Sequence, residues 1–325
     1  MACDKTTLVL MKMKRTLVIG SSGQIGSELV PALRQKYGKE NVIEADLKPP
    51  TALQDNDLFL CLDALNRDEL TKIVRDYKIE TIYHLASILS ATGEKVPQTA
   101  WNVNMNSLLN VLEVGRELKI QRIVWPSSIA AFGPSTPKEN TPNDTILRPT
   151  TMYGVTKVAG ELLVEYYLKK YGLDTRSMRL PGIISSETPP GGGTTDYAVE
   201  IFYEAIKKKK YSCFVNEKTM LPMMYMPDCI KSFIDLAEAD GSRLKHRVFN
   251  VASMSFTAEQ LASEIKKYIP GFKIEYKPDF RQQIADSWPK SIDDSLAREE
   301  WDWKPSYDLT SMTEDMIEKL TAKLK

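Results

Sequence analysis

The stretch Thr16-Leu17-Val18-Ile19-Gly20-Ser21-Ser22-Gly23-Gln24-Ile25-Gly26 decides the fold of this chain. A β-branched run ends in glycines that recur at every third position, and a segment of helical period then continues to Tyr37. Glycines at this spacing permit a tight turn and let a pyrophosphate approach the backbone, while the helix N-terminus offers free N–H groups to the phosphates. The stretch therefore predicts a dinucleotide site formed by Gly20, Gly23, Gln24, Ile25 and Gly26.

Two acidic residues follow at the ends of later apolar runs. Asp46 stands about 20 residues beyond the glycines, where a dinucleotide-binding unit places an acid on the adenine ribose. Its carboxylate can accept hydrogen bonds from both ribose hydroxyls but would repel a 2′-phosphate, and no Arg stands beside it. NAD is therefore favoured over NADP, and nearby Lys48 is the one feature that speaks for NADP. Asp63 has two interpretations, a turn acid before a helix that begins near Asn66 or a contact to the adenine.

Strand-like and helix-like segments alternate from Arg15 to Leu180. The predicted strands are Thr16–Ile19, Asn41–Ile43, Thr81–Leu85, Arg122–Trp125 and Thr175–Leu180. The predicted helices are Gly23–Tyr37, Asp68–Tyr77, Gln98–Leu118 and Thr151–Tyr171. This alternation predicts an α/β fold with a doubly wound, Rossmann-type parallel sheet, in which ligands bind at the carboxyl ends of the strands.

The regular alternation ends after Leu180, where a Pro/Gly-rich segment at Glu187–Gly193 is followed by shorter helices and strands. We expect a dinucleotide-binding domain over residues 15–180. Residues 181–325 should mainly form a smaller C-terminal α/β substrate lobe, with some segments returning to the main sheet. Residues 1–14 contain several lysines and one acid, which predicts either an N-terminal extension or a short organellar presequence.

The charge balance and the scarcity of ligating side chains exclude several classes of function. The 325 residues include 43 Lys plus Arg and 43 Asp plus Glu, so neither nucleic acid nor an anionic membrane is expected as a partner. No apolar run is long enough for a transmembrane helix. The two His and four scattered Cys have no metal-ligand spacing, so we expect no metal site and a catalytic base other than histidine.

Tyr153 and Lys157 are four residues apart in a predicted helix, so their side chains lie on one face. An ammonium near the phenol would lower its pKa from about 10 toward working pH, which makes Tyr153 a candidate general base. Ser127 and Ser128 end the preceding strand, where a hydroxyl can hold the oxygen from which Tyr153 takes a proton. Each feature alone is better explained by ordinary helix or turn structure.

Together, the glycine turn, the Ser127-Ser128 strand end and the Tyr153-x-x-x-Lys157 pair resemble the extended short-chain dehydrogenase/reductase family. The resemblance implies that Ser128, which stands 25 residues before Tyr153, is the catalytic hydroxyl, and that Lys157 binds the nicotinamide ribose. It also implies cofactor contacts from Leu62, Asp63, Leu85, Ala86, Ser87, Asn104, Pro181 and Ile183.

Residues 179–185, 190–198 and 286–289 resemble the metal-independent branch of this family, which oxidises L-threonine at its 3-hydroxyl with NAD. The resemblance implies an oxidoreductase that forms 2-amino-3-oxobutanoate. The alternatives are a nucleotide-sugar epimerase or 4-reductase and a catalytically silent dinucleotide-binding scaffold. The expected substrate contacts are Ser90, Ser127, Ser128, Tyr153, Arg179, Thr194, Thr195 and Trp288.

The resemblance also bears on assembly, motion and location. Helices Gln98–Leu118 and Thr151–Tyr171 carry more apolar residues than one sheet face can cover, and relatives pair these helices, so we expect a homodimer. The segment Pro189–Gly193 has the composition of a lid that orders when the amino acid binds after NAD. Because eukaryotic relatives are mostly mitochondrial, the basic leader predicts the mitochondrial matrix, with the cytoplasm as the alternative.

Overall fold

A computed structural model describes residues 15–50 and 57–324. The extension or presequence predicted for residues 1–14 lies outside this part of the chain, so the location of the protein stays a prediction. The main sheet of the described residues has seven strands in the order β10-β6-β5-β4-β1-β2-β3, and every neighbouring pair is parallel. These strands are β1 (Thr16–Ile19), β2 (Val42–Asp46), β3 (Phe59–Cys61), β4 (Thr81–His84), β5 (Arg122–Ser128), β6 (Thr175–Leu180) and β10 (Val248–Asn250).

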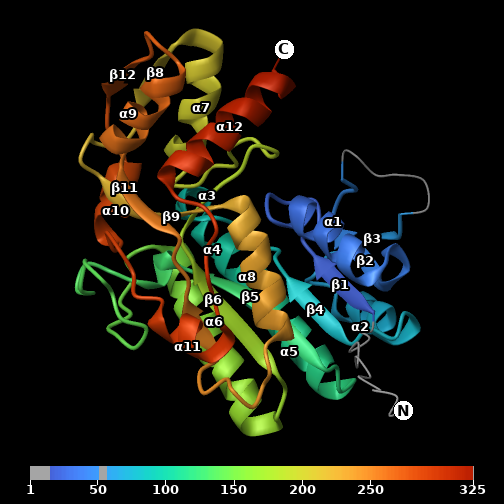
Figure 1. Ribbon diagram of the computed structural model, residues 1–325. Coiled ribbons are helices and arrows are strands. Elements are labelled where there is room, and N and C mark those ends of the chain that lie inside the picture. The colour runs from blue at the N-terminus through green and yellow to red at the C-terminus, as the bar shows by residue number, and fades with distance from the viewer. Residues whose placement is uncertain (1–14, 51–56, 325) are drawn as a thin grey trace, which may run out of the picture.

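Helices cover both faces of this sheet, which confirms the doubly wound architecture (Figure 1). Side chains alternate along each strand, so Leu17 and Ile19 of β1 face one helical layer and Val18 faces the other. The layer on the side of Val18 contains α1 (Gly26–Tyr37), α8 (Met226–Glu238) and α11 (Ser295–Trp301). The opposite layer contains α2 (Arg67–Asp76), α5 (Ser107–Glu117) and α6 (Met152–Tyr171).

The topology places the cofactor turn at the switch point of the sheet. Strand β1 pairs with β2 on one side and with β4 on the other, so the connections after these strands diverge to opposite sides. A crevice therefore opens at the carboxyl ends of β1 and β4, where doubly wound proteins bind their ligands.

Two elements differ from the sequence-based prediction. Strand β3 was not predicted, because it has only three residues and lies half-buried at the sheet edge. The single helix predicted over Gln98–Leu118 is instead α4 (Pro97–Trp101), a π-helical turn at Asn102–Asn106, and α5. A short helix, α3 (Ser90–Lys95), precedes them.

The second half of the chain builds a smaller lobe and also returns to the main sheet. Its strands are β7 (Gly182–Ile184), β9 (Met220–Tyr225) and β11 (Met254–Thr257) in one sheet, and β8 (Lys210–Cys213) and β12 (Lys273–Tyr276) in another. Its helices are α7 (Tyr197–Lys208), α9 (Ala258–Tyr268), α10 (Arg281–Ser287) and α12 (Leu309–Lys323). These elements share one apolar core, whereas α8 and β10 belong to the layers of the main sheet.

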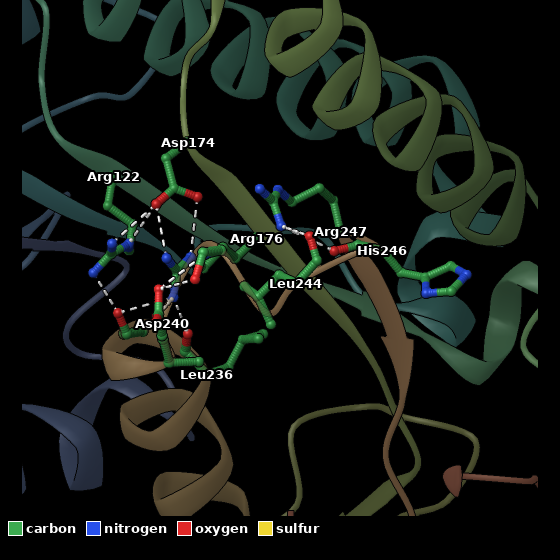
Figure 2. A network of polar contacts seen from close by, with 11 residues as sticks. Arg122, Asp174, Arg176, Leu236, Asp240, Leu244, His246 and Arg247 are labelled. Atoms are coloured by element: carbon green, nitrogen blue, oxygen red, sulfur yellow. Dashed lines mark hydrogen bonds and ion pairs between the residues drawn. The ribbon is translucent and has the colours of Figure 1, made fainter. Parts of the chain in front are cut away.

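A network of arginines fixes α8 at the amino ends of β5 and β6 (Figure 2). The fully buried Arg176 donates hydrogen bonds to the carbonyl oxygens of Leu236 and Ala239, at 2.6 and 2.7 Å. These carbonyls end the helix, where its dipole favours a cation. Asp174 pairs with Arg176 at 2.8 Å and with Arg122 at 2.9 Å. The network holds a helix of the second half against the sheet of the first.

Candidate active site

A cavity of about 140 Å³ lies at the carboxyl ends of the central strands, between the main sheet and the smaller lobe. It gathers most of the residues that the sequence assigned to the nicotinamide and the substrate. The predicted residues that line it are Gln24, Ile25, Leu85, Ser87, Ser90, Ser127, Ser128, Tyr153, Lys157, Pro181, Ile183, Thr194, Thr195 and Trp288. Further lining residues are Leu89, Pro126, Ile129, Leu180, Gly182, Gly193 and Asp196.

The glycine turn has the shape that a bound pyrophosphate requires. Gly20 has a φ of 85°, and a Cβ at this position would lie 2.7 Å from the backbone nitrogen of Ala86. A Cβ on Gly26 would lie 2.3 Å from the carbonyl oxygen of Gly20. Side chains at either position would close the turn, so the residues present fit a dinucleotide whose phosphates lie at the start of α1.

The carboxylate of Asp46 is hydrogen-bonded to the backbone of the glycine turn. It accepts hydrogen bonds from the backbone N–H of Ser22, at 3.0 Å, and of Leu47, at 2.7 Å. Ser22 also donates its hydroxyl to the carbonyl oxygen of Lys48, at 2.7 Å. Asp46 is only partly buried, so the carboxylate at the tip of β2 is still open to ribose hydroxyls.

Asp63 forms a turn in this structure. Its Oδ1 accepts a hydrogen bond from the N–H of Leu65, at 2.9 Å, and its carbonyl oxygen accepts one from Asn66, which caps α2. The preceding Leu62 is buried in the core beneath the sheet. Contact of these two residues with the adenine stays a prediction.

Asn104 lies under the cavity rather than in its lining. Its side-chain oxygen accepts a hydrogen bond from the N–H of Ile88, at 2.7 Å, and its amide donates to the carbonyl oxygen of Ile88, at 3.1 Å. The amide also donates to the hydroxyl of Thr156, at 3.2 Å. The π-helical turn therefore presents Asn104 to both the loop after β4 and the start of α6.

Tyr153 stands in the first turn of α6, which Thr151 caps by accepting a hydrogen bond from Gly154 at 3.1 Å. Burial raises the pKa of Tyr153 to about 12, and a hydrogen bond with Ser128 opposes this rise. The expected lowering by Lys157 is therefore not found in this structure. Burial lowers the pKa of Lys157 to about 7, and its ammonium donates to the carbonyl oxygen of Pro126 at 2.7 Å.

Arg179 lies outside the cavity lining, in contrast to its predicted role as a substrate contact. It is buried and forms a bidentate ion pair with Glu161, at 2.9 and 2.8 Å. Ser127 reaches the cavity, but its hydroxyl donates to the same carboxylate at 2.5 Å. Among the predicted strand-end serines, Ser128 is thus the one that interacts with Tyr153.

The end of the cavity opposite the glycine turn is polar, with an apolar wall formed by Trp288. Ser90 and Thr194 lie within hydrogen-bonding distance of each other, at 3.2 Å between their hydroxyl oxygens. The carboxylate of Asp196 accepts hydrogen bonds from the N–H groups of Gly192 and Gly193, at 2.8 and 2.9 Å. Sequence reasoning missed Asp196, although it directly follows the two predicted threonines.

The two residues that precede the predicted lid (Pro189–Gly193) are tied to both halves of the molecule. The hydroxyls of Thr188 and Ser27 are 3.3 Å apart, which connects the segment to α1. Lys323 at the end of α12 donates to the carbonyl oxygen of Glu187, at 2.6 Å. The order in which this segment closes on its ligands stays a prediction.

Residues 15–50 and 57–324 contain no group of three or more His, Cys, Asp or Glu side chains that could hold a metal ion. Within the same residues, no helix combines the length and the apolar character that crossing a bilayer requires.

The model of the NAD dependent epimerase/dehydratase family matches residues 16–252, which include the glycine turn and the Tyr153/Lys157 pair. The chain belongs to this family. As a family member it is an NAD-dependent oxidoreductase, in agreement with the shape of the glycine turn and the carboxylate of Asp46.

Relatives of this epimerase/dehydratase family member span nearly its whole length. An uncharacterized epimerase/dehydratase of Staphylococcus haemolyticus is 49% identical and covers 96% of this chain and 99% of its own. L-threonine dehydrogenase from Phytophthora infestans is 52% identical, with a TM-score of 0.93 over 95% of this chain and 100% of the other. A monomeric L-threonine 3-dehydrogenase from a metagenome database is 47% identical, with a TM-score of 0.92 over 95% and 100% of the two chains.

Proposed function

We propose that this protein oxidises L-threonine at its 3-hydroxyl with NAD and releases 2-amino-3-oxobutanoate. The proposal rests on one small cavity. Its lining includes both the Tyr, Ser and Lys group and the polar cluster of Ser90, Thr194 and Asp196. Solved structures that are about half identical to this chain bear the name of the same activity. The glycine turn and Asp46 would hold NAD, which would supply the hydride acceptor for this oxidation.

Ser128, Tyr153 and Lys157, which β5 and α6 supply to the cavity, act on the 3-hydroxyl of the substrate. Tyr153, as phenolate, takes the proton of the 3-hydroxyl, and Ser128 holds the same oxygen. Lys157 supplies a positive charge on the same helix face as Tyr153. Because all three side chains are fixed by β5 and α6, the hydroxyl is oriented before the proton moves.

The other end of the cavity suits a free amino acid. Asp196 is the one carboxylate that lines it among the described residues, and an ammonium group is its natural partner. Burial raises the pKa of Asp196, and a substrate cation beside it would counteract that rise. The hydroxyls of Ser90, Thr194 and Thr195 can donate to a carboxylate, and Trp288 can cover a methyl group.

The size of the cavity distinguishes this substrate from a nucleotide sugar. Sites for drug-sized ligands enclose about 300–1,000 Å³, whereas this cavity has about 140 Å³. A free amino acid is the smaller of the two substrates, whereas a nucleoside diphosphate with its sugar would require the cavity wall near Gly193 to move away. The epimerase or 4-reductase is therefore the second candidate.

The test mixes the protein with NAD and either L-threonine or UDP-galactose. NADH is measured by absorbance and UDP-glucose by chromatography, because epimerisation leaves no net NADH. NADH should form with L-threonine and not with UDP-galactose, and the amino ketone product should appear in equal amount. Epimerisation of UDP-galactose without threonine oxidation would favour the second candidate. Inactivity with both substrates would favour a scaffold.

We further propose a homodimer through α4 and α6. Trp101 on α4 is 43% exposed, and Leu162 and Tyr166 on α6 are 65% and 49% exposed, so an apolar surface lies uncovered in the single chain. One solved relative is named as monomeric, so the fold itself does not demand a dimer. Sedimentation of wild type and of Leu162→Glu should yield a dimer and a monomer respectively, and a monomeric wild type would refute the proposal.

A further inference from the structure

Glu161 is a buried carboxylate on the same face of α6 as Tyr153 and Lys157. Tyr153, Lys157 and Glu161 stand at positions i, i+4 and i+8, so their side chains lie on one helix face. Lys157 and Glu161 are only 3% and 4% exposed, and the ammonium of Lys157 lies 5.2 Å from the centre of the Tyr153 ring. The proposed function uses the first two residues and leaves Glu161 without a role.

Glu161 is held in place from two strands. Arg179 of β6 donates from Nε and from a terminal nitrogen to its two oxygens, at 2.9 and 2.8 Å, and Ser127 of β5 donates its hydroxyl at 2.5 Å. Arg179 is itself fixed by the carbonyl oxygen of Asn143, at 2.6 Å, and the side-chain oxygen of Asn250, at 3.1 Å. A bidentate pair of this kind fixes the orientation as well as the position of the carboxylate.

The other groups that face Lys157 supply no negative charge. Its ammonium donates to the carbonyl oxygen of Pro126 and lies 4.5 Å from the centre of the Trp125 ring, both in β5. His84 of β4 is fully buried, and burial together with the charge of Lys157 lowers its pKa to about 3, so it is neutral. Burial alone would favour neutral Lys157, and the carboxylate of Glu161 opposes this effect.

We propose that Glu161, clamped by Arg179 and Ser127, is a positioning residue that keeps Lys157 charged beside Tyr153. When this pair loses one proton, it becomes either a neutral amine with a phenol or an ammonium with a phenolate. Only the second form can take a proton from an alcohol. Glu161 lies one helical turn from Lys157 and two turns from Tyr153, so it stabilises the ammonium more than it destabilises the phenolate.

The inference rests on the proposed function for the role of Tyr153, but the charge of Lys157 can be measured without turnover. Full-length protein labelled with ¹³C at the lysine Cε atoms is titrated by NMR, and the Lys157 signal is assigned by its loss in Lys157→Met. The variants are Glu161→Gln and the double variant Glu161→Gln/Arg179→Met, which leaves no unpaired guanidinium in the core. The matched control is Glu165→Gln, the same change one turn further along α6 at an exposed carboxylate paired with Lys169.

The Lys157 titration midpoint should fall by about one pH unit in both Glu161 variants and stay unchanged in the control. With L-threonine as substrate, kcat should fall about tenfold with little change in KM, because a smaller share of the pair is in the productive form. A wild-type midpoint in Glu161→Gln, or its restoration in the double variant, would overturn the inference. The expected shift in a protein that does not oxidise threonine would support the inference and count only against the proposed function.

Discussion

The ammonium of Lys157 lies 5.2 Å from the centre of the Tyr153 ring but donates its hydrogen bond to the carbonyl oxygen of Pro126, at 2.7 Å. Burial acts on the two residues in opposite directions, raising the pKa of the phenol to about 12 and lowering that of the ammonium to about 7. Both shifts oppose the charged forms that proton removal requires. The pair is therefore sensitive to every further charge that enters the cavity.

Tyr153→Phe should remove the base and keep the shape of the site. Because the hydroxyl takes the proton of the substrate alcohol, kcat/KM for L-threonine should fall by about 10²- to 10⁴-fold. The dissociation constant of NAD, measured by calorimetry, should change little, since the ring stays in place. A variant that retains more than a tenth of the wild-type kcat/KM would rule out Tyr153 as the base.

Lys157→Met should abolish turnover and change how stability depends on pH. The pKa of Lys157 is about 7 in the folded protein and about 10.4 in an unfolded chain, so the unfolded state binds more protons between these values. The unfolding free energy of the wild type should therefore rise with pH in this window, by up to about 1.4 kcal/mol per unit relative to the variant. Denaturant titrations of both proteins at about pH 7 and pH 9 measure the difference. An equal pH dependence for the two proteins would contradict the lowered pKa of Lys157 in the folded protein.

Gly20→Ala should damage the glycine turn. Gly20 has a φ of 85° and no room for a Cβ beside Ala86, so the backbone must shift. We expect a loss of at least about 1–3 kcal/mol in unfolding free energy and weaker NAD binding. Gly191→Ala is the matched control, because a Cβ there meets nothing within 4 Å. Equal stability of the two variants would show that the turn is not confined in this way.

Asp174→Ala should lower the stability of the fold without changing its catalytic activity. The substitution leaves the buried Arg176 and its neighbour Arg122 without their shared carboxylate, so we expect a loss of about 3–5 kcal/mol in unfolding free energy. In the folded fraction, kcat/KM should stay unchanged, because Arg122 begins β5 and the cavity lies at the other end of that strand. Asp302→Asn removes the exposed charge that pairs with Arg243, keeps a residue that tolerates the left-handed backbone at this position, and should cost at most about 1 kcal/mol. A similar small cost at Asp174 would contradict the structural role of the network.

The fold could be predicted from patterns that are local in the sequence. The turn at Gly20 combines a β-branched run, special backbone geometry and a helix start, and all three signals lie within a few residues. Strand β3 (Phe59–Cys61) left no such signal, because a strand of three residues, two half-buried and one exposed, is too short to show a period. The π-helical turn at Asn102–Asn106 was missed for another reason. Its Asn104 is bound to Ile88 and Thr156, which are distant in the sequence.

For the site as well, the sequence revealed only those residues that local spacing brings together. Tyr153, Lys157 and Ser128 could be found because helix spacing and a strand end place them together. Arg179 was assigned to the substrate because nothing in the sequence connects it with Glu161, which meets it only when β6 packs against α6. The rise in the pKa of Tyr153 also depends on packing, since burial outweighs the hydrogen bond with Ser128.

The most direct test of the central claim uses L-threonine that carries deuterium at its third carbon. The protein, NAD and this substrate are mixed, and the reduced cofactor is analysed by mass spectrometry. We predict one deuterium in each NADH molecule formed by the wild type, and at least about a hundredfold less labelled NADH from Tyr153→Phe in the same time. NADH without deuterium, or no NADH at all from the wild type, would contradict the proposal that this cavity oxidises threonine at its 3-hydroxyl.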